Sequence, residues 1–289
     1  MRFGVNLLLF GDTVDRRMLR WFPRLRELGV EGVEIPVFNP ESVPADLIRA
    51  QAEKHGLALT ASGALPPGTR FYGPARAPRA AAARYIRACI KTVKALGASL
   101  ICGPLYKAVG DCDTSLPLEA QRRETIAALA PLLREAEQAA VVLAFEPLNR
   151  FETNLINTVA QGIAFCRALH SSSAGLLLDT FHMHIEEKDS AAAVRAAAAA
   201  GVFRHFHASE NDRGAAGTGQ VHWDAVAGAV RQSRYSGWCM LESFNQNNQA
   251  IRTAVSCWRP FYTSETAFVT DGLKFVKHLF ACRSKISKR

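Results

Sequence analysis

The chain has 289 residues, of which 48% are hydrophobic and 21% are charged, and its formal net charge is +9. No stretch reaches the ~18 consecutive apolar residues of a membrane span, and the first ten residues lack the profile of a signal peptide, so we expect neither membrane insertion nor secretion. The basic residues are spread along the chain without the interleaved aromatic residues of single-strand-binding proteins, so nucleic acid is not an expected partner.

The seven cysteines are scattered, odd in number and free of any CxxC pair. A disulfide framework or a zinc ribbon is therefore not expected. This cysteine usage favours a reducing cytoplasm as the location of the protein.

Apolar runs alternate with amphipathic or alanine-rich stretches along the whole chain. The apolar runs predict eight strands, at residues 3–9, 30–35, 57–62, 99–102, 141–145, 175–178, 203–206 and 238–241. The stretches between and after them predict eight helices, at residues 15–28, 44–55, 79–96, 118–138, 159–169, 190–200, 224–232 and 265–280. Several glycines fall between a predicted helix and the next strand, where helices commonly end.

Eight strand–helix units in a chain of this length predict an α/β fold, a (β/α)8 or TIM barrel that spans residues 1–289 as a single domain. The alternative is a doubly wound open sheet, but no glycine-rich phosphate loop follows an early strand. In a barrel the active site lies at the carboxyl ends of the strands. Long segments follow the third, fourth and eighth predicted strands, at 63–78, 103–117 and 243–264.

A residue of metal-ligand type stands at the exit of four consecutive predicted strands. The run at 141–145 stops at Glu146, and the next three runs stop at Asp179, His207 and Glu242. Roughly thirty residues, the length of one strand–helix unit, separate each of the four from the next. One charged strand end is ordinary, but four at the same end of a sheet predict a metal site.

The types of these four residues indicate which metal and which chemistry to expect. Three carboxylates and one imidazole suit Mn²⁺, Mg²⁺ or Co²⁺ better than a structural Zn²⁺, which prefers thiolates. On an octahedral ion they leave two positions for adjacent oxygens of a substrate such as a ketose, whose enediolate the ion would stabilise. Glu146 and Glu242 could flank that substrate, one removing a proton and the other returning one to the opposite face. The pair therefore predicts inversion of a stereocentre next to a carbonyl.

Three more polar residues are candidates for substrate binding. Glu152 lies six residues beyond the first candidate ligand, His182 three beyond the second, and Arg213 six beyond the third. Any one of them alone would more often be a surface residue or part of a loop salt bridge.

Four other polar residues carry weaker signals. Glu34, at the end of the second predicted strand, either supports the metal ligands or is an ordinary strand-end charge. His184, His205 and His222 are interpreted as structural residues: the first as an exposed ring, the second as lying beside a strand and the third as lying near a helix start.

Four stretches resemble the signatures of a known family: EPLNRFET at 146–153, LDTFHMHIEE at 178–187, HFHASENDRG at 205–214 and LESF at 241–244. They are similar to the D-tagatose 3-epimerase group, which includes the D-psicose (allulose) and L-ribulose 3-epimerases, within the xylose-isomerase-like barrels. GPLY at 103–106 and CWRPF at 257–261 match the same group. The resemblance runs over most of the chain.

The resemblance implies that the four strand-end residues bind one divalent metal ion, with Mn²⁺ expected first and Co²⁺ or Mg²⁺ as alternatives. It implies that Glu146 and Glu242 are also the acid/base pair at sugar C3, in a metal-dependent ketose 3-epimerase that works through a cis-enediolate. Glu152, His182 and Arg213 would hold the O1–O3 end of the ketose. A homodimer or homotetramer is implied as well.

Some positions depart from the pattern of this group. Ser243 stands where a proline often follows the last ligand, and Ser209 stands where a glycine often follows the metal histidine. Asp212 and His184 replace asparagines, and the segment 63–78 lacks the acidic, serine-containing pattern of the group. These changes leave the four candidate ligands intact and bear on which sugar binds.

Other functions fit the same residues. An aldose–ketose isomerase, or an enzyme that acts on oxidised sugars or glycosides, could use the same metal site, since one barrel hosts many reactions. A metal-dependent nuclease-like barrel is a more distant alternative. It would need more histidines at strand ends than this chain has, and only the net charge favours it.

Overall fold

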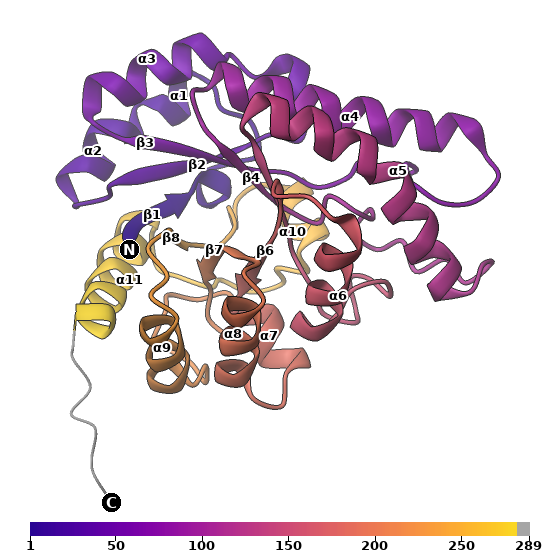
Figure 1. Ribbon diagram of the computed structural model, residues 1–289. Coiled ribbons are helices and arrows are strands. Elements are labelled where there is room, and N and C mark those ends of the chain that lie inside the picture. The colour runs from indigo at the N-terminus through magenta and orange to yellow at the C-terminus, as the bar shows by residue number, and fades with distance from the viewer. Residues whose placement is uncertain (282–289) are drawn as a thin grey trace, which may run out of the picture.

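The computed structural model describes residues 1–281, and the basic tail at the end of the chain lies outside them. Eight parallel strands form a closed barrel in which each strand pairs with the next and β8 pairs with β1 (Figure 1). The predicted (β/α)8 barrel is confirmed. In chain order the strands are β1 (Arg2–Asn6), β2 (Gly32–Pro36), β3 (Ala58–Ser62), β4 (Leu100–Gly103), β5 (Val142–Phe145), β6 (Ala174–Asp179), β7 (Phe203–Ala208) and β8 (Trp238–Leu241).

Helices surround the barrel and connect its strands (Figure 1). In chain order they are η1 (Leu7–Leu9), α1 (Arg16–Leu19), α2 (Trp21–Glu27), η2 (Pro40–Ser42), α3 (Ala45–His55), α4 (Arg76–Ala95), α5 (Leu118–Ala139), α6 (Val159–Leu169), α7 (Thr180–Glu186), α8 (Ser190–Ala199), α9 (Trp223–Gln232), α10 (Gln249–Ala254) and α11 (Glu265–Ala281). The two η elements are short 3-10 helices.

Two predicted elements are divided in the structure. The strand predicted at 3–9 ends at Asn6, whose side chain accepts a hydrogen bond from the backbone N–H of Leu8 and starts the helix η1. The helix predicted at 15–28 forms two helices, α1 and α2, which meet at Arg20. Pro23 lies in the first turn of α2, where its missing N–H is not needed.

Two short helices follow strand ends without having been predicted. Helix α7 begins directly after β6 because the side chain of Asp179 accepts hydrogen bonds from the backbone N–H groups of Phe181 and His182. Helix α10 begins after Asn248, whose side chain caps it in the same way. In both cases a single capping residue starts a helix too short to show periodicity in the sequence.

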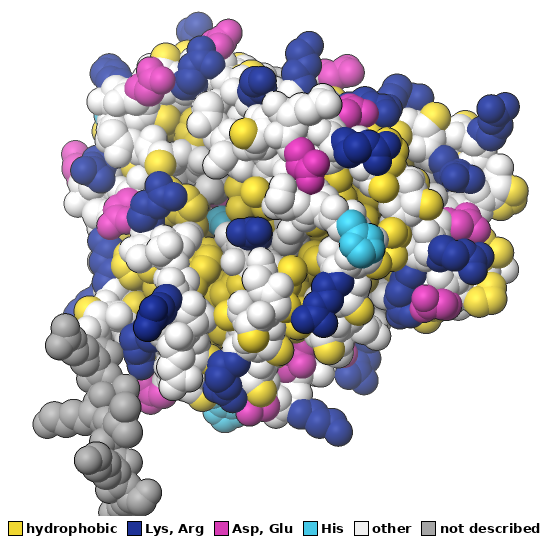
Figure 2. All heavy atoms as spheres, viewed as in Figure 1, with side chains coloured by type: hydrophobic (Ala, Val, Ile, Leu, Met, Phe, Trp, Pro, Cys, Tyr) yellow, Lys and Arg dark blue, Asp and Glu magenta, His cyan; other side chains and the backbone are white. Residues whose placement is uncertain are grey.

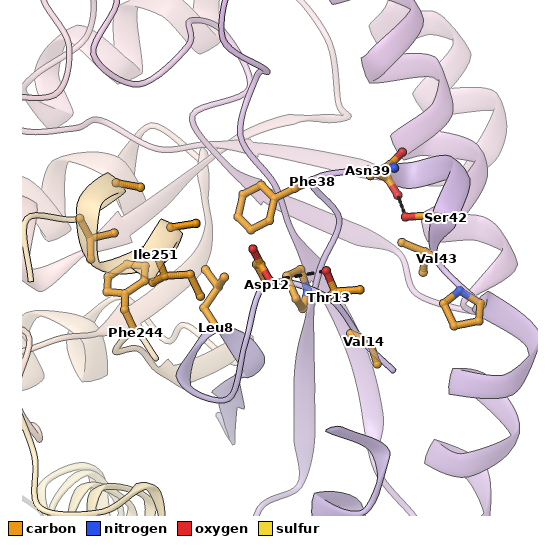
Figure 3. A pocket seen from close by; sticks show the side chains of 15 residues that line it. Leu8, Asp12, Thr13, Val14, Phe38, Asn39, Ser42, Val43, Phe244 and Ile251 are labelled. Carbon is orange, nitrogen blue, oxygen red and sulfur yellow. Dashed lines mark hydrogen bonds between the residues drawn. The ribbon is translucent and has the colours of Figure 1, made fainter. Parts of the chain in front are cut away.

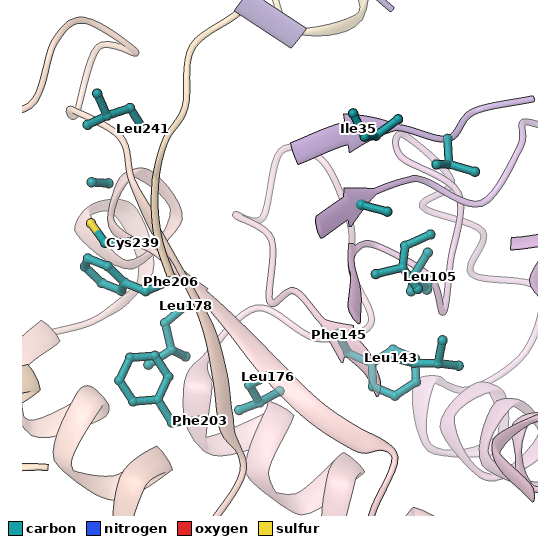
Figure 4. Close-up of a cluster of buried hydrophobic side chains, with 14 of the residues drawn as sticks. Ile35, Leu105, Leu143, Phe145, Leu176, Leu178, Phe203, Phe206, Cys239 and Leu241 are labelled. Carbon is teal, nitrogen blue, oxygen red and sulfur yellow. The ribbon is translucent and has the colours of Figure 1, made fainter. Parts of the chain in front are cut away.

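A layer of apolar side chains fills the space between the strands and the surrounding helices (Figure 4). Phe145, Leu176, Phe206 and Leu241 belong to this layer and are 0% exposed. Burial of this apolar surface is the main force that holds the helices on the barrel.

The interior of the barrel is more polar than this outer layer. Side chains alternate between the two faces of a strand, so His205 and His207, on either side of Phe206, point inward. Both are almost completely buried, and both contact Glu34, which reaches in from β2. The fold thus places a polar row inside the barrel, directly under the strand ends.

On the face of the molecule shown in Figure 2, Lys and Arg side chains are interspersed with acidic and apolar ones. This distribution agrees with the spread of basic residues along the sequence. Within residues 1–281, no helix has the length and apolar character needed to cross a bilayer.

Gly103, at the end of β4, provides a test of how tightly the strand ends are packed. Its φ of +122° is unfavourable for other residues, and a Cβ there would clash with the carbonyl oxygen of Gly63. We expect Gly103→Ala to lower the free energy of unfolding by about 3 kcal/mol, measured by chemical denaturation. Gly228→Ala is the control, because this helical glycine has open space around its Cβ position. Equal stability of the two variants would contradict tight packing at Gly103.

Candidate active site

The carboxyl ends of four neighbouring strands bring together the residues predicted as metal ligands. Glu146 follows β5, Asp179 ends β6, His207 lies in β7 and Glu242 follows β8. One ligand-type atom of each lies within 4.8 Å of those of the others, and all four side chains are buried. Together they could hold one metal ion.

Asp179 shows how the local structure orients these groups. Its Oδ1 caps helix α7 by accepting from the backbone N–H of Phe181 at 2.6 Å. Its Oδ2 therefore remains available and faces the centre of the cluster, 3.7 Å from Nδ1 of His207 and 3.5 Å from Nη1 of Arg213. Helix α7 thus fixes the direction of this carboxylate.

The carboxylates of the cluster repel one another. Burial, followed by the charges of Glu242 and Asp179, raises the pKa of Glu146 well above its usual range. Burial also raises the pKa of Asp179 to about 7, against the opposing charge of Arg213. Burial would raise the pKa of Glu242 too, but His207 and Arg213 lower it to about 2. A divalent cation among these groups would relieve the remaining repulsion.

The ring of His207 fits the role of a metal ligand. Its Nδ1 is buried and makes no hydrogen bond, although it lies 3.0 Å from Oε1 of Glu242. Its Nε2 lies 2.7 Å from Oε1 of Glu34, and because a carboxylate can only accept, Nε2 carries the proton. Burial would lower the pKa of His207, but the charges of Glu242 and Glu34 raise it well above its usual range, so without a cation Nδ1 carries a proton as well. A divalent cation would take the place of that proton beside the three carboxylates, so the residues present fit a cation with mainly oxygen ligands.

The three predicted substrate-binding residues line one cavity with Glu146. Nε2 of His182 lies 3.7 Å from Oε1 of Glu146 and 3.2 Å from Nη2 of Arg213. Burial and the charge of Arg213 lower the pKa of His182 well below its usual range, so its ring is neutral at pH 7. Asn149, which the sequence did not single out, donates from its side chain to Oε1 of Glu152 and from its backbone to Nδ1 of His182. It therefore holds both side chains in place.

Arg213 is fixed on several sides. Its guanidinium group lies 3.7 Å from the ring of Phe181 and 4.9 Å from the ring of Phe244. Nη1 donates to the hydroxyl of Ser209, and the hydroxyl of Ser243 donates to the backbone carbonyl of Arg213. The two serines that depart from the family pattern thus both contact Arg213, whose φ is +66°.

The cavity in front of these groups has a volume of about 390 Å³. Its inner end carries the charged side chains, whereas Leu65 and Phe244 are among the apolar residues of its wall. Residues 63–67, from the segment that departs from the family pattern, belong to that wall. A second cavity of about 450 Å³ lies beside it and shares Leu8, Phe38 and Phe244 with it (Figure 3).

Sequence reasoning missed part of the polar row behind the ligands. His205, interpreted as a structural residue beside a strand, is fully buried inside β7, and its Nε2 lies 2.7 Å from Oε2 of Glu34. Residues 205 and 207 lie two apart in a strand and therefore share a face, a pattern that could have predicted that His205 points into the barrel beside His207. Asn6 donates to both Glu34 and Glu242. The structure therefore favours the reading of Glu34 as a support for the ligands.

Comparison with known proteins agrees with this geometry. Residues 22–261 match the family described as xylose isomerase-like TIM barrel. The chain is 30% identical to a probable ketose 3-epimerase of Synechocystis sp., over 97% of both chains. It is also 30% identical to an L-ribulose 3-epimerase of Mesorhizobium japonicum, over 95% of this chain and 93% of that one.

Among solved structures, a D-allulose 3-epimerase from Methylomonas sp. is similar with a TM-score of 0.90 and 26% identity, over 96% of this chain and 98% of that one. The relatives thus share the barrel over nearly its whole length. The chain belongs to the xylose isomerase-like TIM barrel family, in its ketose 3-epimerase group, and is a carbohydrate isomerase.

Proposed function

We propose that the protein is a metal-dependent ketose 3-epimerase, which inverts C3 of a free ketohexose or ketopentose. The observation that carries this proposal is the pair of buried glutamates, Glu146 and Glu242. They come from strands three apart and meet at the inner end of one cavity. The volume of that cavity is within the range of small-molecule sites. Two carboxyl groups that approach one carbon from opposite sides can remove and return a proton with inversion.

In the proposed reaction, one glutamate takes the proton from C3 of the ketose. The electrons of the C3–H bond pass toward the C2 carbonyl oxygen, which gives a cis-enediolate. The other glutamate then donates a proton to the opposite face of C3 while the carbonyl group re-forms. The product has the same atoms as the substrate and differs only in its configuration at C3.

The surrounding residues would hold the sugar for this reaction. Arg213 presents guanidinium nitrogens and His182 presents a ring nitrogen to the O1–O3 end of the ketose. Glu152 can accept a hydrogen bond from a hydroxyl group. The apolar wall of the cavity would contact the rest of the sugar and exclude water. A divalent cation, held by Glu146, Asp179, His207 and Glu242, would supply Lewis-acid stabilisation of the negative charge on the substrate oxygens.

We further propose Mn²⁺ as the cation, with Co²⁺ or Mg²⁺ as alternatives, because oxygen ligands dominate the cluster. A cytoplasmic location is supported by the six cysteines of residues 1–281, all of which are free thiols. A homodimer or homotetramer is supported by two large apolar side chains at the surface, Phe151 with 75% and Trp258 with 66% exposure.

One observation favours a second candidate function. The neighbouring cavity in Figure 3 could take a substituent that a free ketose lacks. An enzyme that acts on oxidised sugars or glycosides would use the same proton transfer on a larger substrate. Turnover of glycosides but not of free ketoses would favour this candidate over the first.

Incubation with Mn²⁺ and a panel of free ketoses in D₂O tests the proposed reaction. The panel contains D-fructose, D-psicose, D-tagatose and L-ribulose. We expect the C3 epimer to form with deuterium at C3, because the proton that returns exchanges with solvent. NMR of the sugars measures both changes. Formation of an aldose, or deuterium at C1 in place of C3, would contradict the proposal and indicate an aldose–ketose isomerase.

The variants Glu146→Gln and Glu242→Gln test the acid/base pair. We expect each to lower kcat about 10²- to 10⁴-fold, because an amide cannot exchange a proton with carbon at neutral pH. Steady-state kinetics, together with the metal content of each variant, measures the effect. Glu135→Gln is the control, since this side chain lies in an exposed ion pair with Arg87. Activity near that of the wild type in either site variant would exclude the residue as acid or base.

Removal of the metal tests whether the activity depends on a divalent cation. Dialysis against a chelator should abolish epimerase activity, and addition of Mn²⁺ or Co²⁺ should restore it. Binding to the folded state should also raise the melting temperature, which differential scanning fluorimetry measures. Full activity in a metal-free sample, checked by elemental analysis, would contradict metal dependence.

A further inference from the structure

A row of three buried side chains crosses the barrel behind the candidate metal site. Nε2 of His205 lies 2.7 Å from Oε2 of Glu34, and Nε2 of His207 lies 2.7 Å from Oε1 of the same carboxylate. Glu34 and His205 are both 0% exposed, and His207 is 1% exposed. Glu34 therefore connects the candidate ligand His207 to a second histidine that lies deeper in the barrel.

Every partner of Glu34 is a donor. Asn6 and His207 reach Oε1, whereas the hydroxyl of Thr60, the thiol of Cys102 and His205 reach Oε2. The amide nitrogen of Asn6 can only donate and the other four groups are able to donate, so these five contacts favour the ionised form of Glu34, which accepts on both oxygens. It therefore keeps the Nε2–H form of each histidine ring.

This arrangement determines what His207 can do on its other side. With the proton held at Nε2, the neutral ring has its lone pair at Nδ1, the atom that faces Glu146, Asp179 and Glu242. A ring that flipped, or that moved its proton to Nδ1, would present a donor or a carbon to the metal site. Asn6 adds a second connection, because its side chain donates to both Glu34 and Glu242.

We propose that Glu34, held in place by His205, is a positioning residue that fixes the tautomer and the ring orientation of His207 for metal binding. The inference rests on the metal site of the proposed function and extends it to two residues that do not line the cavity. Carboxylates that orient metal-binding histidines in this way commonly change metal affinity 10- to 100-fold when mutated.

The chain offers a matched control for this proposal. Glu210 is also 0% exposed, and it accepts from the backbone of Asn211, Gly217 and Val221 and from the indole of Trp223. It holds the loop after β7 in place, and it lies outside the buried clusters of side chains that could bind a metal ion. Glu210→Gln therefore removes a buried carboxylate that accepts from several donors, and it leaves Glu34, His205 and His207 unchanged.

The experiment is a titration of the metal-stripped protein with Mn²⁺, in which isothermal titration calorimetry measures the affinity. We expect Glu34→Gln to weaken the affinity for Mn²⁺ about 10- to 100-fold. The amide nitrogen of the glutamine must face at least one donor and cannot accept from it, so the His207 ring is no longer held in one orientation. Glu210→Gln should leave the affinity within about twofold of the wild type, although both variants lose stability. Unchanged affinity in Glu34→Gln, or equal weakening in both variants, would overturn the proposal.

Two further measurements keep the test decisive if Glu34→Gln does not fold. His205→Leu removes one donor to Oε2 and leaves Thr60 and Cys102, so it should weaken Mn²⁺ binding about two- to tenfold. In the wild type with Mg²⁺, ¹⁵N NMR should show His207 protonated at Nε2 and not at Nδ1. A proton on Nδ1 would overturn the proposal, as would a His205→Leu variant with wild-type affinity. None of these readouts requires sugar turnover. If the variants show the expected order of Mn²⁺ affinities but the wild type epimerises no ketose, the positioning role is supported and the proposed reaction is refuted.

Discussion

Buried negative charge at one end of the barrel is the constraint on which the rest of the site depends. Glu146, Asp179 and Glu242 lie within a few ångströms of one another in a buried region, where none of them is more than 7% exposed. Charged groups in such a region are costly unless cations or donors compensate them. His207 and Arg213 supply part of that compensation, and the neighbouring residues serve largely to hold these two in place.

Each compensating group is fixed by a different part of the fold. The ring of His207 is held from below by the polar interior of the barrel, through Glu34 and His205. Arg213 is held by contacts with Phe181 of helix α7 and with Phe244, which follows β8. The strand ends thus carry the charges, the barrel interior orients the imidazole, and helix α7 together with the segment after β8 orients the guanidinium group. This division explains why residues so far apart in the sequence act on one small volume.

The sequence was sufficient for the barrel and for the convergence of the four strand-end residues, because both follow from a pattern that repeats with each strand–helix unit. The helices α7 and α10 were not predictable in the same way, since each depends on one capping side chain, Asp179 or Asn248. The role of His205 was also missed, because a histidine within an apolar strand looks like any other buried residue until the partner across the barrel is known. Glu34 and His205 are 171 residues apart, and only the closed sheet brings them together.

The two adjoining cavities have a consequence for how this protein can change. Their shared wall consists of Leu8, Phe38, Phe244, Ala254 at the end of α10, and Val255, and none of these belongs to the charged cluster. Substitutions at Leu8 and Phe38 could alter the size and shape of the molecule admitted while the reactive groups stay as they are, whereas Phe244 also contacts Arg213. The wall and the charged cluster thus come largely from different residues, so the shape of the cavities can change, under natural selection or in the laboratory, while the cluster is kept.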